Sequence, residues 1–252
     1  MILEEKKEYI LNKLNENKIL RIDDLARDLG CTTASVRYIV NDLSEKKLLK
    51  RVHGGVAIDN RAVLDMPENI VKTRNIEMKE YIADIAVNLI SDNSTIILDS
   101  GTTNVILANK IRNFKNLNII TNSIKIAYLL MDRPNLNIIV IGGAVRTITH
   151  SIVNYGKENI LEYLQADKLF LNCGAVTIKE GVTDPNMQEA KIKRDIIERS
   201  KEVVLLADSS KFGKISLSLV CTLDKINKII TDNSINQEYL ERIREMNTAV
   251  LN

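Results

Sequence analysis

The stretch VRYIVNDLSEKKLLKRVHGGVA, residues 36–57, predicts a helix followed by a β-hairpin. Its apolar residues recur with the spacing i, i+3, i+4 and i+7, which places one stripe along a helix: Val36, Ile39, Val40 and Leu43. Strand-forming residues follow from Leu48 to Val52, and His53-Gly54-Gly55 predicts a turn into a second short strand. The opposite face of this helix is polar and suited to entering a groove.

Two more helices are predicted upstream of this stretch. Glu4–Leu14 carries apolar residues on one face, and Ile22–Leu29 is a short helix that begins near Asp23 and ends at Gly30. Three helices and a hairpin together predict a winged helix-turn-helix, a fold that binds DNA. A small helical interaction domain with a charged surface is the alternative.

The distribution of charge favours DNA binding. Residues 32–58 contain five Lys and Arg against two Asp and Glu, whereas residues 59–252 contain 24 basic and 24 acidic residues. Basic side chains gathered in one region suit contact with phosphates. For the hairpin we expect contacts to the DNA backbone from Lys50, Arg51 and His53. For the helix and its first turn we expect contacts to base edges from Thr32, Thr33, Ser35, Arg37, Tyr38 and Asn41.

The 252 residues have room for one ordinary domain and a small one. We expect a DNA-binding domain over residues 1–58, a linker without a helical or strand period over 59–75, and a larger domain over 76–252. No run approaches the roughly 20 apolar residues of a membrane span, and the first eight residues are too charged for a signal peptide. The sequence therefore predicts a cytoplasmic protein without a membrane partner.

Cysteine and histidine usage gives no indication of a metal site or of disulfides. Cys31, Cys173 and Cys221 are odd in number, far apart and without metal-ligand spacing, so we expect them to be reduced and structural. Only two histidines occur, His53 and His150, and we expect the second to be a loop residue rather than a base. No cofactor and no metal are expected.

Helices and strands alternate through the larger domain. The predicted helices lie at residues 79–90, 102–111, 123–131, 156–165 and 186–200. The predicted strands lie at residues 95–98, 117–121, 137–141, 168–172, 202–207 and 228–231. Several of these strands are apolar at consecutive positions, as expected for a parallel sheet buried on both faces between helices. The fold class is therefore α/β, with a mainly parallel sheet.

Small polar residues gather where the predicted strands end. Because ligands of open parallel sheets bind beyond the carboxyl ends of the strands, we expect an effector site there. The segments after the first two strands supply Asp99, Ser100, Gly101, Thr102, Thr103, Thr121, Asn122 and Ser123. Later segments and one helix supply Gly142, Gly143, Arg146, Glu189, Lys193, Asp208, Ser210 and Lys211.

The chemistry of these residues indicates a phosphorylated polyol. A Ser-Gly-Thr-Thr turn at a helix N-terminus offers backbone N–H groups and hydroxyls to a phosphate, and Lys and Arg add positive charge. Carboxylates accept hydrogen bonds from sugar hydroxyls. The alternative is that the turn only caps its helix and that Glu189, Lys193 and Arg194 form a solvated helix face.

The whole chain resembles the DeoR family of bacterial transcription regulators. Matching pieces in the larger domain are Asp99-Ser-Gly-Thr-Thr, Thr121-Asn-Ser, Gly142-Gly143 through Arg146 to Ser151, Gly181-Val-Thr-Asp-Pro, Glu189–Arg194 and Asp208-Ser-Ser-Lys-Phe-Gly. The family's recognition helix opens with Thr-Ile-Arg-Arg-Asp-Leu, whereas this chain has Ser35-Val36-Arg37-Tyr38-Ile39-Val40. A second departure is Asn154, where the family usually has Gly.

The resemblance implies a ribose-phosphate-isomerase-like sensor domain and a repressor of a carbohydrate operon. Operator DNA and a phosphorylated sugar are then the expected partners, and two half-sites in the operator imply a homodimer or homotetramer. One alternative is a sugar-phosphate isomerase or deaminase with Asp99, Glu189, Lys193 or Asp208 as acid or base. Another is a scaffold for oligomerisation with a vestigial pocket.

Overall fold

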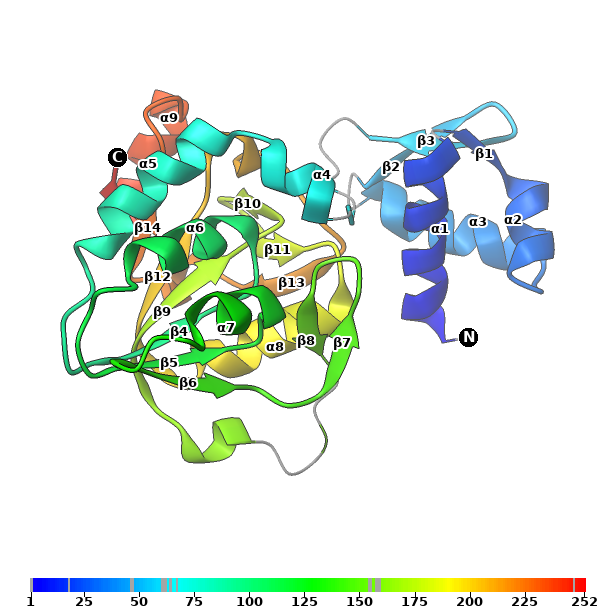
Figure 1. Ribbon diagram of the computed structural model, residues 1–252. Coiled ribbons are helices and arrows are strands. Elements are labelled where there is room, and N and C mark those ends of the chain that lie inside the picture. The colour runs from blue at the N-terminus through cyan, green and yellow to red at the C-terminus, as the bar shows by residue number, and fades with distance from the viewer. Residues whose placement is uncertain are drawn as a thin grey trace.

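The computed structural model consists of a small N-terminal domain beside a larger one (Figure 1). The structure describes residues 2–17, 19–45, 48–59, 63, 65–66, 68–153, 156, 160–246 and 248–252. Among the residues discussed above, Lys46, Lys47 and Asn154 lie outside the described ranges.

The small domain is a winged helix-turn-helix. Its helices are α1 (Leu3–Asn17), α2 (Ile22–Asp28) and α3 (Thr33–Glu45), and its strands are β1 (Ile19–Arg21), β2 (Leu49–Val52) and β3 (Gly55–Ile58). The strands form an antiparallel sheet in the order β1-β3-β2, so the predicted hairpin gains a strand that the sequence analysis missed. Three residues are too few for an alternating pattern to be seen. Gly55 permits the close approach of β1, because a Cβ there would lie 2.3 Å from the Leu20 carbonyl oxygen.

The core of the small domain contains the predicted helical stripe. Val36, Ile39, Val40 and Leu43 are all buried, and they pack with apolar residues of α1 and α2 such as Ile10. Thr32 caps α3, since its Oγ1 accepts a hydrogen bond from the Ser35 backbone N–H at 3.2 Å. Packing of this stripe fixes which residues of α3 face outward.

The segment predicted as a linker contains a helix, α4 (Glu68–Thr73). Six residues cover less than two turns, so no amphipathic period marks them in the sequence. The segment is held against the larger domain: the Val63 N–H donates to the Ile215 carbonyl at 2.8 Å, and Lys79 Nζ donates to the Val71 carbonyl at 2.6 Å. We refer to residues 59–75 as the connector.

In the described part of the larger domain, seven parallel strands form the central sheet in the order β15-β14-β12-β9-β4-β5-β6. Their bounds are β4 (Thr95–Leu98), β5 (Leu117–Thr121), β6 (Leu136–Val140), β9 (Ala166–Asn172), β12 (Ser200–Leu206), β14 (Lys228–Ile230) and β15 (Ala249–Leu251). The chain runs outward from β4 to β6 and returns on the other side of β4 as β9. The predicted α/β fold with a mainly parallel sheet is thus confirmed.

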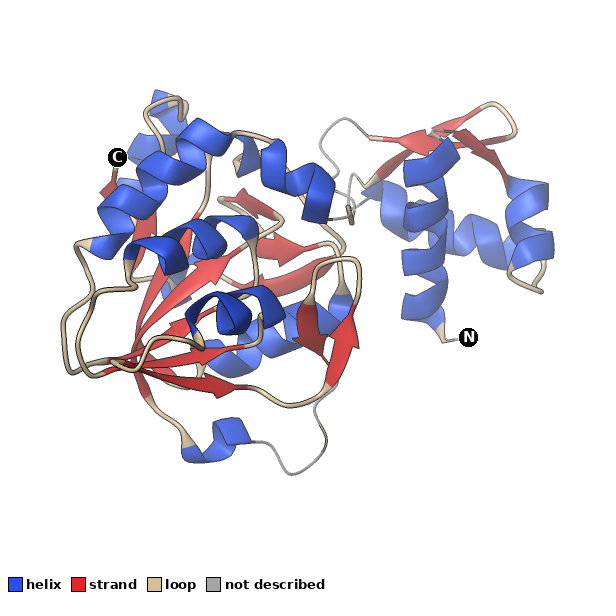
Figure 2. Cartoon of the chain, viewed as in Figure 1, coloured by secondary structure: helices blue, strands red, loops and turns tan. Residues whose placement is uncertain are grey.

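Helices cover both faces of this sheet (Figure 2). The helices are α5 (Ile76–Val87), α6 (Thr102–Lys110), α7 (Ile124–Leu130), α8 (Met187–Ile197) and α9 (Gln237–Glu245). Ile96 and Leu98 of β4 belong to the core that contains residues of α5, α6 and α7, whereas Ile97 belongs to the core on the other face, which contains residues of α8 and α9. Alternate side chains of a strand point to opposite faces, so consecutive apolar residues serve two cores.

Strand β6 differs from the expectation of burial on both faces. It is an edge strand, and its last residue, Val140, is 38% exposed. Residues 156–165, predicted as a helix, contain in their described part a short 3-10 helix, Ile160–Tyr163. The expectation for β6 was wrong because an apolar run does not reveal its place in the sheet, and the α-helix expected over residues 156–165 is not found in their described part.

Several short elements of the larger domain were not predicted. The strands are β7 (Ala144–Arg146), β8 (Ser151–Val153), β10 (Ala175–Thr177), β11 (Gly181–Asp184), β13 (Ser218–Cys221) and the edge strand β15, and the helix α9 was not predicted either. Two further 3-10 helices span Ser209–Lys211 and Leu223–Lys225. β7 pairs with β8 in a hairpin, and the order β10-β11-β13 makes a second small sheet. These strands of three or four residues carry the turns that border the cavity described below.

Candidate functional site

The polar face of α3 is exposed as the spacing predicts. Tyr38 is 67% exposed, and Arg37, Asn41 and Ser35 also face solvent, whereas Thr33 is half-buried at the start of the helix. Thr32 is exposed but occupied, because its hydroxyl lies 2.9 Å from that of Ser35. These residues are placed where a helix in the major groove presents side chains to base edges.

The hairpin formed by β2 and β3 presents its charged residues outward. Lys50, Arg51 and His53 are all exposed. Arg51 Nη1 donates to Asn41 Oδ1 at 3.2 Å, so the hairpin and α3 form one continuous polar surface. Contacts of these residues with DNA remain predictions.

A cavity of about 360 Å³ opens beyond the carboxyl ends of β4 and β9. Successive strands are added on one side of β4 up to β6 and then, from β9, on its other side. Open parallel sheets bind ligands at the point where the strand order reverses in this way. Ser100 and Gly101 follow β4, and Asn172 ends β9. Gly101 has φ 151°, and a Cβ there would lie 2.6 Å from Asn172 Cγ, so only glycine fits this turn.

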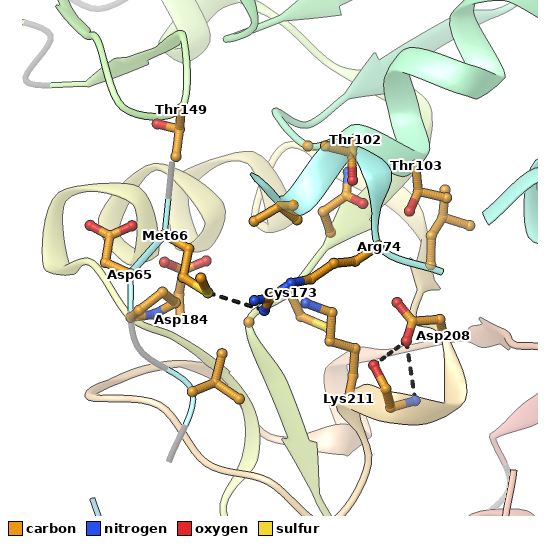
Figure 3. Close-up of a pocket in the computed structure, with 18 of the residues that line it drawn as sticks. Asp65, Met66, Arg74, Thr102, Thr103, Thr149, Cys173, Asp184, Asp208 and Lys211 are labelled. Atoms are coloured by element: carbon orange, nitrogen blue, oxygen red, sulfur yellow. Dashed lines mark hydrogen bonds between the residues drawn. The ribbon is translucent and has the colours of Figure 1, made fainter. Parts of the chain in front are cut away.

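One side of the cavity is positively charged. Four basic side chains line it: Arg74, Lys79, Lys211 and Lys214. In Figure 3, Arg74 and Lys211 both reach into the cavity. The N-terminus of α6, with Thr102 and Thr103, lines the same cavity and has no acidic residue in its first turn. Backbone N–H groups, hydroxyls and cations together favour an anion.

Lys79 is the buried member of this basic group. It is 3% exposed, and its Nζ donates to the Val71 carbonyl. Burial lowers the pKa of Lys79 to about 8, and the nearby positive charges of Lys211 and Arg74 also lower it, against the opposing effect of Asp208. An anion in the cavity would favour the protonated form of this lysine.

Asp208 organises the loop that carries Lys211. Its Oδ1 accepts from the Ser210 N–H at 3.1 Å and from Asn75 Nδ2 at 3.0 Å, and Asn75 also donates to Ser210 Oγ at 3.0 Å. Asn75 has φ 52°, a left-handed conformation that Asn tolerates. The loop after β12 is therefore tied directly to the end of the connector.

The opposite side of the cavity is acidic and rests on a buried lysine. Lys193 of α8 is 2% exposed and pairs with Asp99, while Asp184 lies 3.8 Å away. Burial by itself lowers the pKa of Lys193, but Asp99, Asp184 and Glu189 outweigh it and hold the pKa above its ordinary value. Burial raises the pKa of Asp184 to about 7. The alternative of a solvated helix face is wrong for Lys193 and Glu189.

Glu189 is buried at the cavity wall and accepts three side-chain hydrogen bonds on Oε1. The donors are Arg146 Nη1 at 2.9 Å, Thr149 Oγ1 at 2.5 Å and Ser151 Oγ at 2.8 Å. Burial opposes its ionisation, but Lys193 and these hydrogen bonds hold the pKa of Glu189 below its ordinary value. A carboxylate held in this way can accept a hydrogen bond from a ligand hydroxyl.

Some predicted effector residues lie behind the described cavity wall rather than on it. Asn122 Oδ1 accepts from the Ser100 N–H at 2.8 Å, so it holds the turn after β4. Thr121 Oγ1 donates to the Leu98 carbonyl at 2.7 Å, and Ser123 caps α7. Asp99 is fully buried and supports Lys193. These four residues shape the wall from behind.

Three other predicted effector residues are also absent from the described cavity lining: Gly142, Gly143 and Arg146. Gly142 and Gly143 are exposed beyond β6, which is separated from β4 by β5. Neighbouring strands lie about 4.8 Å apart, so the end of β6 is roughly 10 Å from the end of β4. Arg146 is held between Asp65 and Glu189. Residues along one segment do not specify strand order, so the distance between the ends of β6 and β4 could not be foreseen. Contact of these three residues with an effector stays a prediction.

Several residues of the cavity lining, on the connector and after β9, were not predicted. The connector contributes Asp65, Met66, Arg74 and Asn75 to the cavity lining, and Cys173 and Asp184 line the same cavity. Asp184 belongs to the Gly181-Val-Thr-Asp-Pro motif, which was available as a signal. The connector residues carry no such motif, because their role depends on packing against a domain distant in sequence.

The cysteines and histidines do not add chemistry to this cavity. Burial raises the pKa of Cys173 to about 12, so its thiol stays protonated near neutral pH. His150 lies in the turn between β7 and β8, as expected for a loop residue, and pairs with Glu68. Within the described ranges, no group of three or more His, Cys, Asp or Glu is arranged to hold a metal ion.

No described helix is long and apolar enough to cross a membrane.

The fold, the polar surface of α3 and the hairpin, and the cavity define a winged-helix DNA-binding protein with a second domain that contains a small-molecule cavity. Residues 7–62 match the model of the DeoR-like helix-turn-helix domain, and residues 74–233 match that of the DeoR C-terminal sensor domain. The chain therefore belongs to the DeoR family of transcriptional regulators.

Individual relatives agree with this assignment. The regulator GolR of Listeria innocua is 32% identical over 248 residues, covering 98% of this chain and 97% of the relative. The lactose phosphotransferase system repressor of Staphylococcus epidermidis is 34% identical over 230 residues, covering 89% and 90%. These relatives are regulators rather than enzymes. Ribose 5-phosphate isomerase A of Methanocaldococcus jannaschii resembles the structure with a TM-score of 0.41 and 20% identity, over 56% of each chain.

Proposed function

We propose that this protein represses a carbohydrate-metabolism operon and that a phosphorylated sugar in the cavity controls its binding to operator DNA. The observation that carries the proposal is the composition of the cavity wall. Ile58 at the end of the DNA-binding domain, Val63 and Asp65 of the connector, and strand-end residues of the larger domain all line one cavity. A molecule bound there touches the segment that positions the DNA-binding domain.

The two sides of the cavity support a phosphate and a polyol respectively. Lys79, Lys211 and Arg74 converge with the N-terminus of α6, which suits a phosphate group. Asp65, Asp184 and Glu189 lie on the other side and suit hydroxyl groups. A cavity of about 360 Å³ is within the range of sites that enclose a small ligand.

Contacts between the domains support coupling of the cavity to DNA binding. Ile215 and Leu217, which follow the Asp208 loop, pack against the core of the winged helix. Glu8 of α1 accepts a hydrogen bond from Asn186 Nδ2 at 2.6 Å, and Asn186 caps α8. A ligand changes DNA affinity only if it binds the two domain arrangements unequally. These contacts lie next to Pro185 and Lys214, which line the cavity.

Recognition of an operator implies further properties. Winged-helix and other helix-turn-helix regulators use two copies on two half-sites, so we expect a homodimer or a homotetramer. A protein that acts on a bacterial operator works in the cytoplasm. The base-edge residues are those on the exposed face of α3, with Lys50, Arg51 and His53 on the DNA backbone.

The test measures DNA affinity with and without sugar phosphates. Fluorescence anisotropy at fixed salt gives the affinity with and without each sugar phosphate. It is measured on DNA from upstream of the protein's own gene and on a scrambled control. The panel is glucose 6-phosphate, fructose 6-phosphate, ribose 5-phosphate and glycerol 3-phosphate, with the unphosphorylated sugars as controls. We expect selective DNA binding that one phosphate ester weakens by about tenfold or more.

A matched pair of variants assigns the response to the cavity. Lys211→Met removes a cation from the lining, whereas Lys201→Met removes one that pairs with Asp167 at the surface. We expect the first variant to lose the response and the second to keep it. Equal binding to operator and scrambled DNA, or an undiminished response in Lys211→Met, would contradict the proposal.

A further inference from the structure

Arg146 joins two segments that line the acidic side of the cavity, the connector and α8. Its Nη2 pairs with Asp65 on the connector, and its Nη1 lies 2.9 Å from Glu189 Oε1 on α8. Both carboxylates line the cavity, whereas Arg146 itself is not part of the described lining. The side chain therefore lies behind the wall and holds the connector to the larger domain.

The bridge is buried, which separates it from an ordinary surface ion pair. The side chains of Arg146, Asp65 and Glu189 are 12%, 8% and 9% exposed. Removing one partner of a buried, hydrogen-bonded ion pair leaves an uncompensated buried charge, whereas exposed ion pairs contribute little to stability. The position of the connector thus depends on this pair much more than on a pair at the surface.

The geometry needs an arginine. Two separate nitrogens of one planar guanidinium meet two different carboxylates, and Nη1 also donates to Thr149 Oγ1 at 3.2 Å. A lysine has a single ammonium at the end of its side chain and does not reproduce the fork. Three acceptors from the connector, α8 and the β7–β8 turn engage the guanidinium, which suits a positioning role rather than a ligand contact.

A ligand bound beside Asp65 and Glu189 acts on this bridge directly. Among the described residues, the side chains that donate to Glu189 all do so at Oε1, so Oε2 is left for a ligand hydroxyl. A hydroxyl that donates to Glu189 Oε2 or to Asp65 competes with Arg146 for the negative charge of that carboxylate. Occupancy of the cavity therefore changes how tightly the connector is held.

The geometry points to Arg146 as the positioning residue that transmits occupancy of the cavity to the connector, through its bridge between Asp65 and Glu189. This inference rests on the proposed control of DNA binding by a sugar phosphate. It assigns Arg146 to communication between the domains, in place of the direct effector contact predicted from the sequence.

The experiment uses two bridge variants and one control in the full-length protein. Arg146→Lys keeps the charge but loses the fork, and Asp65→Asn keeps the shape but removes one carboxylate. The control is Lys125→Gln, which removes an ion pair of 2.8 Å to Glu68 on the same connector. Lys125 is 39% exposed and is not part of the described lining, and Glu68 keeps its contact with His150. For each variant and the wild type, hydrogen exchange of the connector amides 68–75 is measured without ligand. Operator affinity, by fluorescence anisotropy, and the melting temperature are measured with and without the four sugar phosphates named above.

We expect faster exchange of the connector amides in Arg146→Lys and Asp65→Asn and wild-type exchange in Lys125→Gln. The change in DNA affinity caused by a sugar phosphate should fall about tenfold in Arg146→Lys, while that sugar phosphate still raises its melting temperature. The double variant Asp65→Asn/Arg146→Lys should lose no more than either single variant, since both changes break one bridge.

The assignment is overturned if both bridge variants keep wild-type exchange and the wild-type effect of the sugar phosphate on DNA affinity. It is also overturned if Lys125→Gln shows an equal loss. A wild-type protein that responds to none of the four sugar phosphates contradicts the proposed function instead. In that case the exchange rates alone decide whether Arg146 holds the connector. A structural role without communication would slow or speed exchange but leave the ratio of the two DNA affinities unchanged, which also overturns the assignment.

Discussion

The exposed face of α3 and the cavity of the larger domain are assembled over different distances along the chain. The α3 face comes from one helix and the hairpin after it. The cavity is built from widely separated segments: Asn75 and Asp208, hydrogen-bonded at its rim, are 133 positions apart. A local site needs only a local core, whereas a non-local site depends on the correct packing of the whole domain.

The largest expected effect is on the domain that contains the cavity. Lys193→Met leaves Asp99 and Asp184 buried without their cation, so we expect a loss of about 4 kcal/mol in the free energy of unfolding. Urea denaturation measures it. Lys191→Met, two positions earlier, removes an exposed i,i+4 pair with Asp195 and should cost below about 0.5 kcal/mol. Similar costs for the two variants would show that Lys193 is not the support of the cavity wall.

The second prediction concerns the small domain. Leu43→Ala removes a fully buried side chain from its core, and we expect a loss of about 3 kcal/mol. DNA affinity should fall with it, while the larger domain should keep its stabilisation by a bound sugar phosphate, measured by differential scanning calorimetry. Loss of that stabilisation would mean that the two regions fold as one cooperative unit.

The third prediction distinguishes the helix from the hairpin within the DNA-binding surface. Arg37→Ala should cost about 1–3 kcal/mol in operator affinity and relax selectivity, because Arg37 lies on the exposed face of α3. Lys50→Ala should weaken binding to all sequences alike and reduce the salt slope by about one. Anisotropy titrations over a salt series measure both quantities. The reverse pattern would move base recognition to the hairpin.

The smallest effect is the pH dependence of anion binding through Lys79. A bound anion favours the protonated lysine, whose pKa is about 8 in the free protein, so affinity should fall as pH rises through that value. The loss should approach about tenfold per pH unit at most, measured by calorimetry with the sugar phosphate that gives the response. Lys79→Arg stays charged and should remove the pH dependence.

The sign for stability without a ligand is opposite. Because folding lowers the pKa of Lys79 from 10.5 to about 8, the folded state binds a proton less well than the unfolded chain. Protonation of Lys79 therefore destabilises the fold, and this destabilisation is relieved as pH rises from about 8 to 10.5. Stability that does not depend on pH over this range in wild type, compared with Lys79→Arg, would contradict the burial of a titrating lysine.

Periodicity predicted the elements with long and regular patterns. The stripe Val36, Ile39, Val40 and Leu43 is buried as expected, and β4, β5, β9 and β12 lie within a few residues of their predicted positions. β1, α4 and the β7–β8 hairpin were missed, because these short elements contain neither a period nor a long run of apolar residues, whereas strands such as β4 do contain such a run. The helix α9 was also missed. The hairpin nevertheless carries Arg146 and Thr149, which hold Glu189.

The cavity was predicted in part. Ser100 to Thr103, Glu189, Lys193, Asp208, Ser210 and Lys211 line it as the strand-end argument expects. Gly142 and Gly143 at the end of β6 are not part of the described lining, because β5 separates β6 from β4. The connector was not predicted to line the cavity, because a segment without a motif gives no indication of what it will contact.

The sequence by itself determined the winged helix, the α/β class and the kinds of residue that follow each strand, because these depend on contacts between near neighbours in the chain. Only the tertiary structure decided which strand ends meet, that the connector closes one wall of the cavity, and that Arg146 bridges the walls instead of lining them. Strand order and the path of the connector follow from packing between segments far apart in the sequence, and a pattern of residues along one segment carries no record of its distant partner.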